Sequence, residues 1–162
     1  MDFTPRDITR LTGVQPGTLR EWRRQTSIGK DLGRQEGSDR WRYSATDALT
    51  IWMIARAREE GAGVMRAWQV AFWCLPAVEH YLGARIEQDP VKKQVWTESA
   101  HEIGPRFAIF PPDGGNPAIV GDLTEIADYR DDKLARYEVW DLQALARAVP
   151  ERLPLELRDI GS

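Results

Sequence analysis

Apolar side chains in the first 25 residues recur at helical spacing in two short runs. Each run holds two apolar residues three positions apart, Ile8 with Leu11 and Leu19 with Trp22. That spacing places both members of a pair on one face of a helix. Two short helices in close succession are the arrangement of a helix-turn-helix.

Capping and turn residues mark where these helices begin and end. Thr4 followed three residues later by Asp7 predicts a capping box, with Pro5 in the first turn. Gly13 predicts the end of this helix, and Pro16 predicts the start of the second. The turn between the two helices is therefore expected to span three or four residues.

The helical periodicity ends after residue 25. Residues 26–43 contain three glycines and finish in the alternating sequence Arg40-Trp41-Arg42-Tyr43. These features predict a β-hairpin with its tip near residues 37–39. A hairpin that directly follows a helix-turn-helix is a wing.

Two further helices are predicted after the hairpin. Ser44 and Asp47 form a second capping box at the start of the first of them. The other begins near Val64, and Pro76 is expected to kink or restart it before Gly83.

The second half of the chain changes character. A charged segment with a short helix at 91–103 comes first. The strand-like stretches and the last helix that follow it lie at 106–110, 118–120, 124–129 and 136–140, and from Asp141 to near Pro150. We therefore predict an α+β fold with a mainly helical winged helix-turn-helix domain in residues 1–83. Residues 84–162 are expected to form a small antiparallel sheet with a helix, used for oligomerisation or for binding a partner or effector.

Composition narrows the classes of function. Hydrophobic residues make up 42% of the 162, yet no apolar run approaches the roughly 20 residues of a membrane span. The N-terminal segment lacks the apolar stretch of a signal peptide, so we expect a soluble protein of the cytoplasm. The single cysteine, Cys74, lies in an apolar run and is predicted to be a buried thiol. The sequence contains only two histidines in addition to this cysteine, so it predicts no metal site and no cofactor.

Charge is unevenly distributed along the chain. Residues 1–43 hold nine Lys and Arg against six Asp and Glu, whereas the rest hold thirteen against nineteen. A basic N-terminal part is typical of a DNA contact surface, although an ordinary solvated surface gives the same mild asymmetry.

The N-terminal part resembles the MerR-type DNA-binding domains. The matching sequences are FTPRDITRLTGVQPGTLREW, GSDRWRYSATD and AREEGAGV, which together span residues 3 to about 75. The ending RWRYS is more similar to phage-encoded and excisionase-like relatives than to the metal sensors. The resemblance implies that the second helix enters the major groove of double-stranded DNA and that the wing lies against the neighbouring backbone.

The resemblance also implies which residues touch DNA. Those on the second helix and at the end of the wing are Thr18, Arg20, Arg23, Arg40, Arg42 and Tyr43. Spacing independently puts Arg20, Arg23 and Arg24 on one helical face, where a guanidinium reads guanine or clamps a phosphate. The hairpin cations predicted to contact phosphate are Lys30, Arg34, Arg40 and Arg42.

The chain departs from the family pattern at several positions. Gln15 replaces a serine cap, Glu21 replaces a frequent aromatic residue, and Trp41 replaces a common arginine. No uninterrupted heptad run follows residue 75, so the long dimerisation helix of the MerR regulators is missing or replaced. A homodimer is still expected, because one such domain covers only a short half-site.

The aromatic residues after the wing leave two interpretations open. Trp52, Trp68, Phe72 and Trp73 lie in the two later helices. Helical spacing of Trp68, Phe72 and Leu75 indicates core packing. The alternative is an aromatic pocket for an unidentified small-molecule effector, as in drug-sensing relatives.

No arrangement of catalytic side chains can be recognised, so the chain is not predicted to be an enzyme. We expect a sequence-specific transcriptional regulator of a kind that phages and mobile elements encode. The alternatives are an architectural DNA-binding factor for excision or packaging, and a protein-interaction module on a disused helix-turn-helix scaffold.

Overall fold

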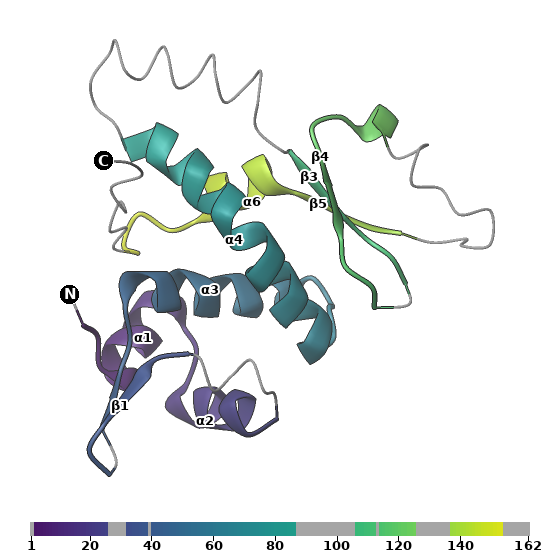
Figure 1. The fold of residues 1–162 in the computed structure, drawn as a ribbon. Coiled ribbons are helices and arrows are strands. Elements are labelled where there is room, and N and C mark those ends of the chain that lie inside the picture. The colour runs from purple at the N-terminus through teal and green to yellow at the C-terminus, as the bar shows by residue number, and fades with distance from the viewer. Residues whose placement is uncertain are drawn as a thin grey trace. The chain divides into compact units, whose positions relative to one another are not determined.

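The computed structural model describes residues 2–25, 32–38, 40–86, 106–112, 114–125 and 137–153. These residues form an α+β fold of helices and small antiparallel sheets, as the sequence predicts (Figure 1). The chain divides into two units, one made of Met1–Phe72 with Val149–Ser162 and the other of Trp73–Ala148. Along the described part of the chain, no helix combines the length and apolar character that a membrane span requires.

The first unit opens with two short helices, α1 (Pro5–Thr12) and α2 (Pro16–Gln25). The predicted capping box is present, since the Thr4 hydroxyl accepts from the Asp7 amide and the Asp7 carboxylate accepts from the Thr4 amide. Gly13 ends α1 in the left-handed conformation, with φ 82°, and its N–H donates to the Thr9 carbonyl at 2.8 Å. The turn therefore forms where the sequence predicts it.

A two-stranded hairpin follows α2. Strands β1 (Arg34–Glu36) and β2 (Arg40–Arg42) pair antiparallel, with Gly37 at the turn between them. The segment before α1 joins the end of this hairpin, because the backbones of Phe3 and Tyr43 exchange hydrogen bonds of 2.8 and 3.0 Å. This bridge fixes the start of the chain beside β2.

Helix α3 (Ala45–Glu59) begins at the predicted Ser44–Asp47 capping box and packs against α1. In Figure 1, α1, α2 and β1 all lie on the same side of α3. The large apolar side chains that α3 buries are Leu49, Ile51, Trp52, Met53 and Ile54. Helix α3 thus supplies much of the core beneath α1 and α2.

Helix α4 (Val64–Ile86) is continuous, so the expected restart at Pro76 is wrong. Proline lacks an N–H and removes one helical hydrogen bond, which is the local reason to expect a break. The helix nevertheless buries apolar side chains on both sides of the proline, among them Cys74 and Val78. The free energy gained by burying these apolar side chains outweighs the loss of one hydrogen bond within the helix.

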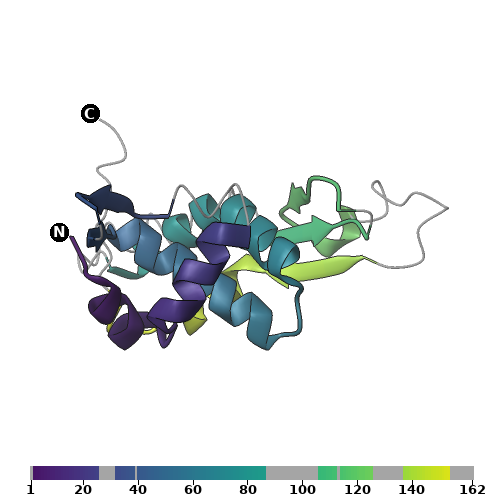
Figure 2. The same cartoon turned by 90° about the horizontal axis from the view of Figure 1, so that it is seen from below.

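The second unit contains a three-stranded antiparallel sheet with the order β4-β3-β5. Its strands are β3 (Phe107–Phe110), β4 (Ala118–Val120) and β5 (Glu138–Asp141), which lie side by side in both Figure 1 and Figure 2. Helix α6 (Leu142–Ala148) follows β5 directly, and the Asp141 carboxylate accepts from the Ala144 amide at 3.0 Å. The predicted sheet and its capped helix are therefore both present.

One sequence prediction for this half differs from the structure. The strand expected at 124–129 does not begin as predicted, because residues 123–125 form a 3₁₀ turn in which the Asp122 carboxylate accepts from the Thr124 amide at 2.8 Å. Residues 126–129 and the helix expected at 91–103 lie outside the described residues. The two units divide at residue 72, inside the continuous α4.

Candidate nucleic-acid interface

Helix α2 buries one face and exposes the other. Leu19 and Trp22 are 2% and 7% exposed, and Trp22 meets the ring of Trp68 edge-to-face with centroids 6.5 Å apart. The residues of α2 that face solvent include Thr18, Arg20, Glu21 and Arg24. The helix is thus anchored through its apolar pair, and three of its four predicted DNA-contacting residues lie on the accessible side.

Arg23, the fourth of them, lies against the hairpin. Its guanidinium carbon is 3.9 Å from the centroid of the Trp41 ring, and Nη1 donates to the Tyr43 hydroxyl. A guanidinium over an aromatic face gains cation–π attraction as well as contact area. Arg23 is half-buried and connects α2 to β2, so it does not share the solvent-facing surface of Arg20 and Arg24 as its spacing predicts.

Tyr43 is a packing residue, although the resemblance implies that it contacts DNA. Its side chain is 1% exposed, and burial raises the pKa of its hydroxyl while the neighbouring Arg23 opposes that rise. The phenol therefore stays neutral and accepts from Arg23 within the protein. Its large ring is better accommodated in the core between α2 and the hairpin than at the surface.

Gly33 permits the hairpin to approach Tyr43 closely. Its φ is +74°, and a Cβ built on it would lie 2.8 Å from the Arg42 carbonyl oxygen and 2.9 Å from the Tyr43 ring. Glycine is the residue that tolerates both this backbone and this spacing. The start of β1 is thereby held against the end of β2.

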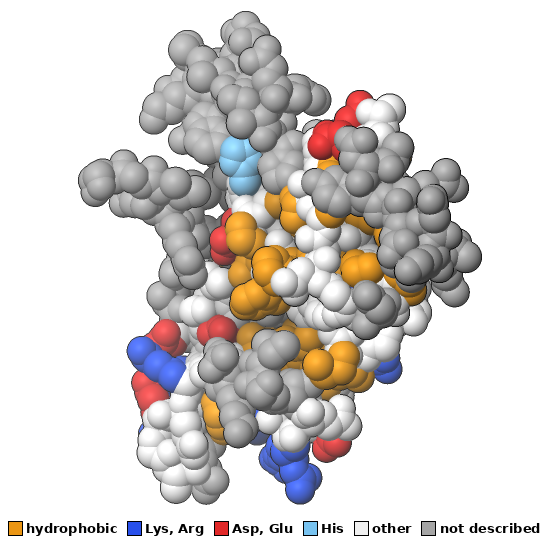
Figure 3. All heavy atoms as spheres, turned by 45° about the vertical axis from the view of Figure 1, so that its right-hand side comes forward, with side chains coloured by type: hydrophobic (Ala, Val, Ile, Leu, Met, Phe, Trp, Pro, Cys, Tyr) orange, Lys and Arg blue, Asp and Glu red, His pale blue; other side chains and the backbone are white. Residues whose placement is uncertain are grey.

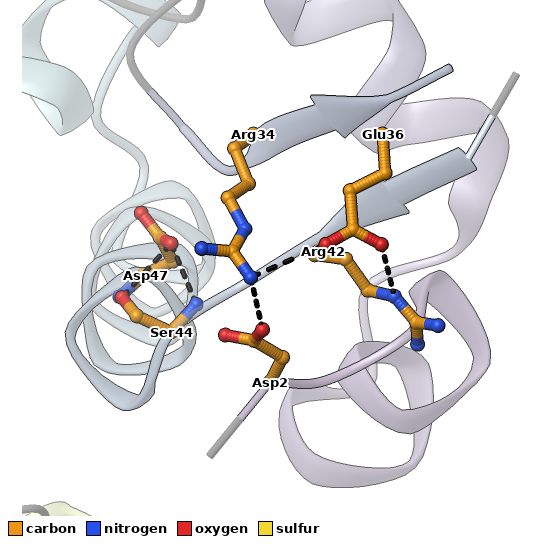
Figure 4. Close-up of polar contacts among 6 residues, drawn as sticks. All are labelled: Asp2, Arg34, Glu36, Arg42, Ser44 and Asp47. Atoms are coloured by element: carbon orange, nitrogen blue, oxygen red, sulfur yellow. Dashed lines mark hydrogen bonds and ion pairs between the residues drawn. The ribbon is translucent and has the colours of Figure 1, made fainter. Parts of the chain in front are cut away.

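The arginines of the hairpin differ in their surroundings (Figure 4). Arg34 pairs with the carboxylates of Asp2 and Glu36, and Arg42 pairs with Glu36 at 3.2 Å. Arg40 is exposed. Lys30, the remaining predicted phosphate contact, lies outside the described residues.

Among the described residues of α2 and the hairpin, three arginines are available to a ligand. Within the described ranges, no carboxylate forms an ion pair with Arg20, Arg24 or Arg40, and all three are exposed. Each guanidinium can therefore offer its donors to phosphate or to a base edge without first breaking an ion pair. Glu21 lies on the same helix and its carboxylate accepts from Gln25 at 2.7 Å.

Asp2 and Glu36 are residues of this region that the sequence alone does not single out. In the sequence both residues contribute only to the net charge, whereas in the structure each pairs with predicted DNA-contacting arginines. The alternation Arg34-Gln35-Glu36 is an available signal for Glu36, because residues two apart share a strand face. No sequence pattern indicates the pairing of Asp2, since its position depends on the backbone bridge between Phe3 and Tyr43.

The four residues of the predicted aromatic pocket differ in their exposure to solvent. Trp52 and Trp68 are 8% and 1% exposed and belong to the core, whereas Phe72 and Trp73 are 61% and 38% exposed. Hydrophobic side chains do reach the surface on the face seen in Figure 3. Helical spacing of Trp68 and Phe72 therefore predicts core packing correctly for the first and wrongly for the second.

Cys74 is fully buried, as predicted, and burial raises the pKa of its thiol to about 12. A thiol in this state remains protonated at neutral pH and is a poor nucleophile. In the described part of the chain, no three His, Cys, Asp or Glu side chains are grouped so as to hold a metal ion.

Comparison of the chain with models of known families, with curated proteins and with solved structures finds no match to any of them.

Proposed function

We propose that the chain is a sequence-specific transcriptional regulator that binds double-stranded DNA. In this proposal the first unit is a winged helix-turn-helix of the MerR type, with α2 as the recognition helix and the β1–β2 hairpin as the wing. The observation that carries the proposal is the solvent-facing side of α2, where Thr18, Arg20 and Arg24 lie opposite the buried Leu19 and Trp22.

The size and chemistry of α2 suit the major groove. An α-helix fits the roughly 12 Å width of that groove, and arginine there can donate to guanine O6 and N7 together. Arg20 and Arg24 are one helical turn apart and exposed, so they can reach neighbouring positions along the groove. Thr18 can donate to or accept from several base edges.

The contact of Arg23 with the hairpin supports the same proposal in another way. Its stacking on Trp41 and its bond to Tyr43 connect the recognition helix to the wing before DNA arrives. A surface whose parts are already held in place loses less conformational freedom when it binds. The exposed Arg40 of β2 then adds a phosphate contact that sets the position of the wing along the backbone.

The proposal assigns the second unit a role in pairing two copies or in binding a partner. A homodimer would place two recognition helices about one helical turn apart on DNA and would read a site with two-fold symmetry. Oligomer formation and any effector are part of this proposal. Two-fold symmetry in the bound sequence would support the homodimer.

The experiment is selection of bound fragments from the source genome, compared between the wild type and Arg20→Ala/Arg24→Ala. We expect a defined motif for the wild type. The double variant should bind it roughly 30-fold or more weakly, because each well-placed arginine contributes roughly 1–3 kcal/mol of base discrimination. A matched control, Arg58→Ala/Arg147→Ala, removes the same charge from exposed arginines of α3 and α6 and should bind as the wild type does.

Absence of any enriched motif, or an equal loss in both double variants, would contradict the proposal. Indifference of binding to the Arg20 and Arg24 changes would indicate that α2 is a scaffold for protein contacts. Bending of the selected site only in the presence of tandem copies would indicate an architectural factor in place of a regulator.

A further inference from the structure

Two arginines face each other across the wing. Arg34 of β1 and Arg42 of β2 are directly paired in the hairpin register. Like charges in opposite positions destabilise a strand pair. A hairpin selected for stability alone would not place two guanidinium groups there.

The carboxylate of Glu36 lies between these two guanidinium groups (Figure 4). Its Oε1 is 3.2 Å from Nη2 of Arg34, and its Oε2 is 3.2 Å from Nε of Arg42. Asp2 supplies a second carboxylate to Arg34, and the Phe3–Tyr43 bridge holds the chain near it. Two anions therefore compensate two cations, and the group of four carries no net formal charge in the free protein.

These ion pairs are accessible to solvent. The side chains of Arg34, Asp2 and Glu36 are 64%, 44% and 45% exposed, and that of Arg42 is 32% exposed. Exposed ion pairs contribute little to stability, because water and salt screen them and both side chains lose rotamer freedom. A competing anion can therefore displace Glu36 without disrupting the fold.

We propose that Arg34 and Arg42 form a clamp for one phosphate of the DNA backbone, and that the Glu36 carboxylate occupies this clamp until DNA displaces it. The inference rests on the proposed function. Guanidinium groups donate charge-assisted hydrogen bonds to carboxylate and phosphate oxygens alike, and here each arginine donates from one nitrogen to one oxygen of Glu36. The two carboxylate oxygens of Glu36 stand where the two non-bridging oxygens of a phosphodiester would be bound.

The consequence of this arrangement is a lower affinity for duplex DNA of every sequence. Phosphate contacts strengthen binding to every duplex alike, because they carry no sequence information. The displacement of Glu36 opposes all binding equally, and base contacts from α2 must compensate it. Glu36 therefore lowers the affinity for every duplex by the same factor, so that at a given protein concentration sites lacking the motif are occupied less, while the ratio of specific to non-specific affinity is unchanged.

The test compares wild type with Glu36→Gln, measured by fluorescence anisotropy on a duplex of about 20 bp, two helical turns, of unrelated sequence at fixed low salt. Removing the internal anion should tighten binding by roughly two- to tenfold, the range expected for losing one or two exposed ion pairs. The same change in an Arg34→Gln/Arg42→Gln background should have little effect, since no clamp remains to be occupied. Glu59→Gln, which removes a glutamate paired with Arg56 on α3, is the matched control and should not alter binding.

The variants distinguish an occupied clamp from a structural role of Glu36 and from simple charge repulsion. Weaker or unchanged binding by Glu36→Gln would overturn the proposal and assign the residue a purely structural role in the hairpin. An equal gain in both backgrounds would also overturn it, since repulsion between Glu36 and DNA does not require the arginines. If the wild type and Glu36→Gln bind no duplex even at low salt, the proposed function itself fails, which is distinct from failure of the clamp alone.

Discussion

Single arginines of the proposed DNA-binding surface serve different purposes, and their neighbours decide which. Arg20 and Arg24 project from α2 into solvent, whereas Arg23 on the same helix is occupied by Trp41 and Tyr43. An arginine held by the protein positions the groups around it, while an exposed one remains available to a ligand. Replacing Arg23 would therefore disturb the placement of the β1–β2 hairpin and would not remove a proposed base contact.

At the same scale, Gly33 gives a sharp test of the hairpin geometry. Gly33→Ala is expected to destabilise the first unit by about 1–2 kcal/mol for the left-handed backbone and by roughly 1–3 kcal/mol more for the clash with the Arg42 carbonyl and the Tyr43 ring. Urea denaturation measures the change in the free energy of unfolding.

Gly37→Ala is the matched control for this prediction. Gly37 also has a positive φ, +72°, but a Cβ there would meet nothing within 4 Å. Gly37→Ala should therefore lower the free energy of unfolding only by the cost of the left-handed backbone. Equal effects of the two substitutions would mean that the close approach of Gly33 to β2 does not exist in solution.

Residue roles are predictable from the sequence where they depend on local spacing. The exposure of Arg20 and Arg24 and the burial of Leu19 follow from helical periodicity. The role of Tyr43 does not, because its bond to Arg23 joins positions 20 residues apart, and a one-dimensional pattern does not contain that contact. The pairing of Asp2 with Arg34 is unpredictable for the same reason.

Helices and strands are predictable where their ends carry their own capping groups. Both capping boxes and the left-handed Gly13 are satisfied by residues three or four positions away, so they form as the sequence predicts. The strand expected from Thr124 fails because a local bond from its amide to Asp122 favours a tight turn. The restart expected in α4 fails because burial along the helix, a tertiary effect, outweighs the local defect at Pro76.

The local cost of Pro76 within α4 can be measured. Pro76→Ala restores an N–H to the helix interior and should raise the free energy of unfolding by about 2 kcal/mol. This value is the helical cost of proline relative to alanine, about 3 kcal/mol, less about 1 kcal/mol for the stiffer unfolded chain that proline provides. Thermal and urea denaturation of the full chain would both report it. A destabilised variant would show that the proline shapes α4 in a way the packing requires.

On the scale of the whole molecule, the first unit is assembled from two separate parts of the chain. The described residues after α6 belong with α1–α3, where the Arg152 guanidinium donates to the Leu11 carbonyl at 3.0 Å and Leu153 is 3% exposed. The sequence pattern does not predict this return, because a single leucine after a helix gives no indication of which core it joins.

Leu153→Ala should therefore destabilise the first unit, although residue 153 lies beyond the whole second unit. The expected loss is roughly 2–4 kcal/mol, the usual range for truncating a buried leucine. Amide hydrogen exchange in α1 is the readout, because it reports opening of the first unit by itself. Leu123→Ala, at a leucine that is 45% exposed, should leave exchange in α1 unchanged. Exchange in α1 of Leu153→Ala that is as slow as in the wild type would show that residues 149–153 do not support this unit.

The discontinuity of the first unit also sets an order of events during translation. Helix α2, the recognition helix of the proposed function, leaves the ribosome before the second unit, whereas Val149–Leu153 emerge only after Trp73–Ala148 have been synthesised. At elongation rates of about 5–20 residues per second, this interval lasts roughly 4–15 s. During that time α1–α3 lack the residues that complete their core, and the nascent chain holds a basic helix without its full support. Under the proposed function, competence to bind DNA would then be acquired only after the inserted unit has been synthesised and has had time to fold.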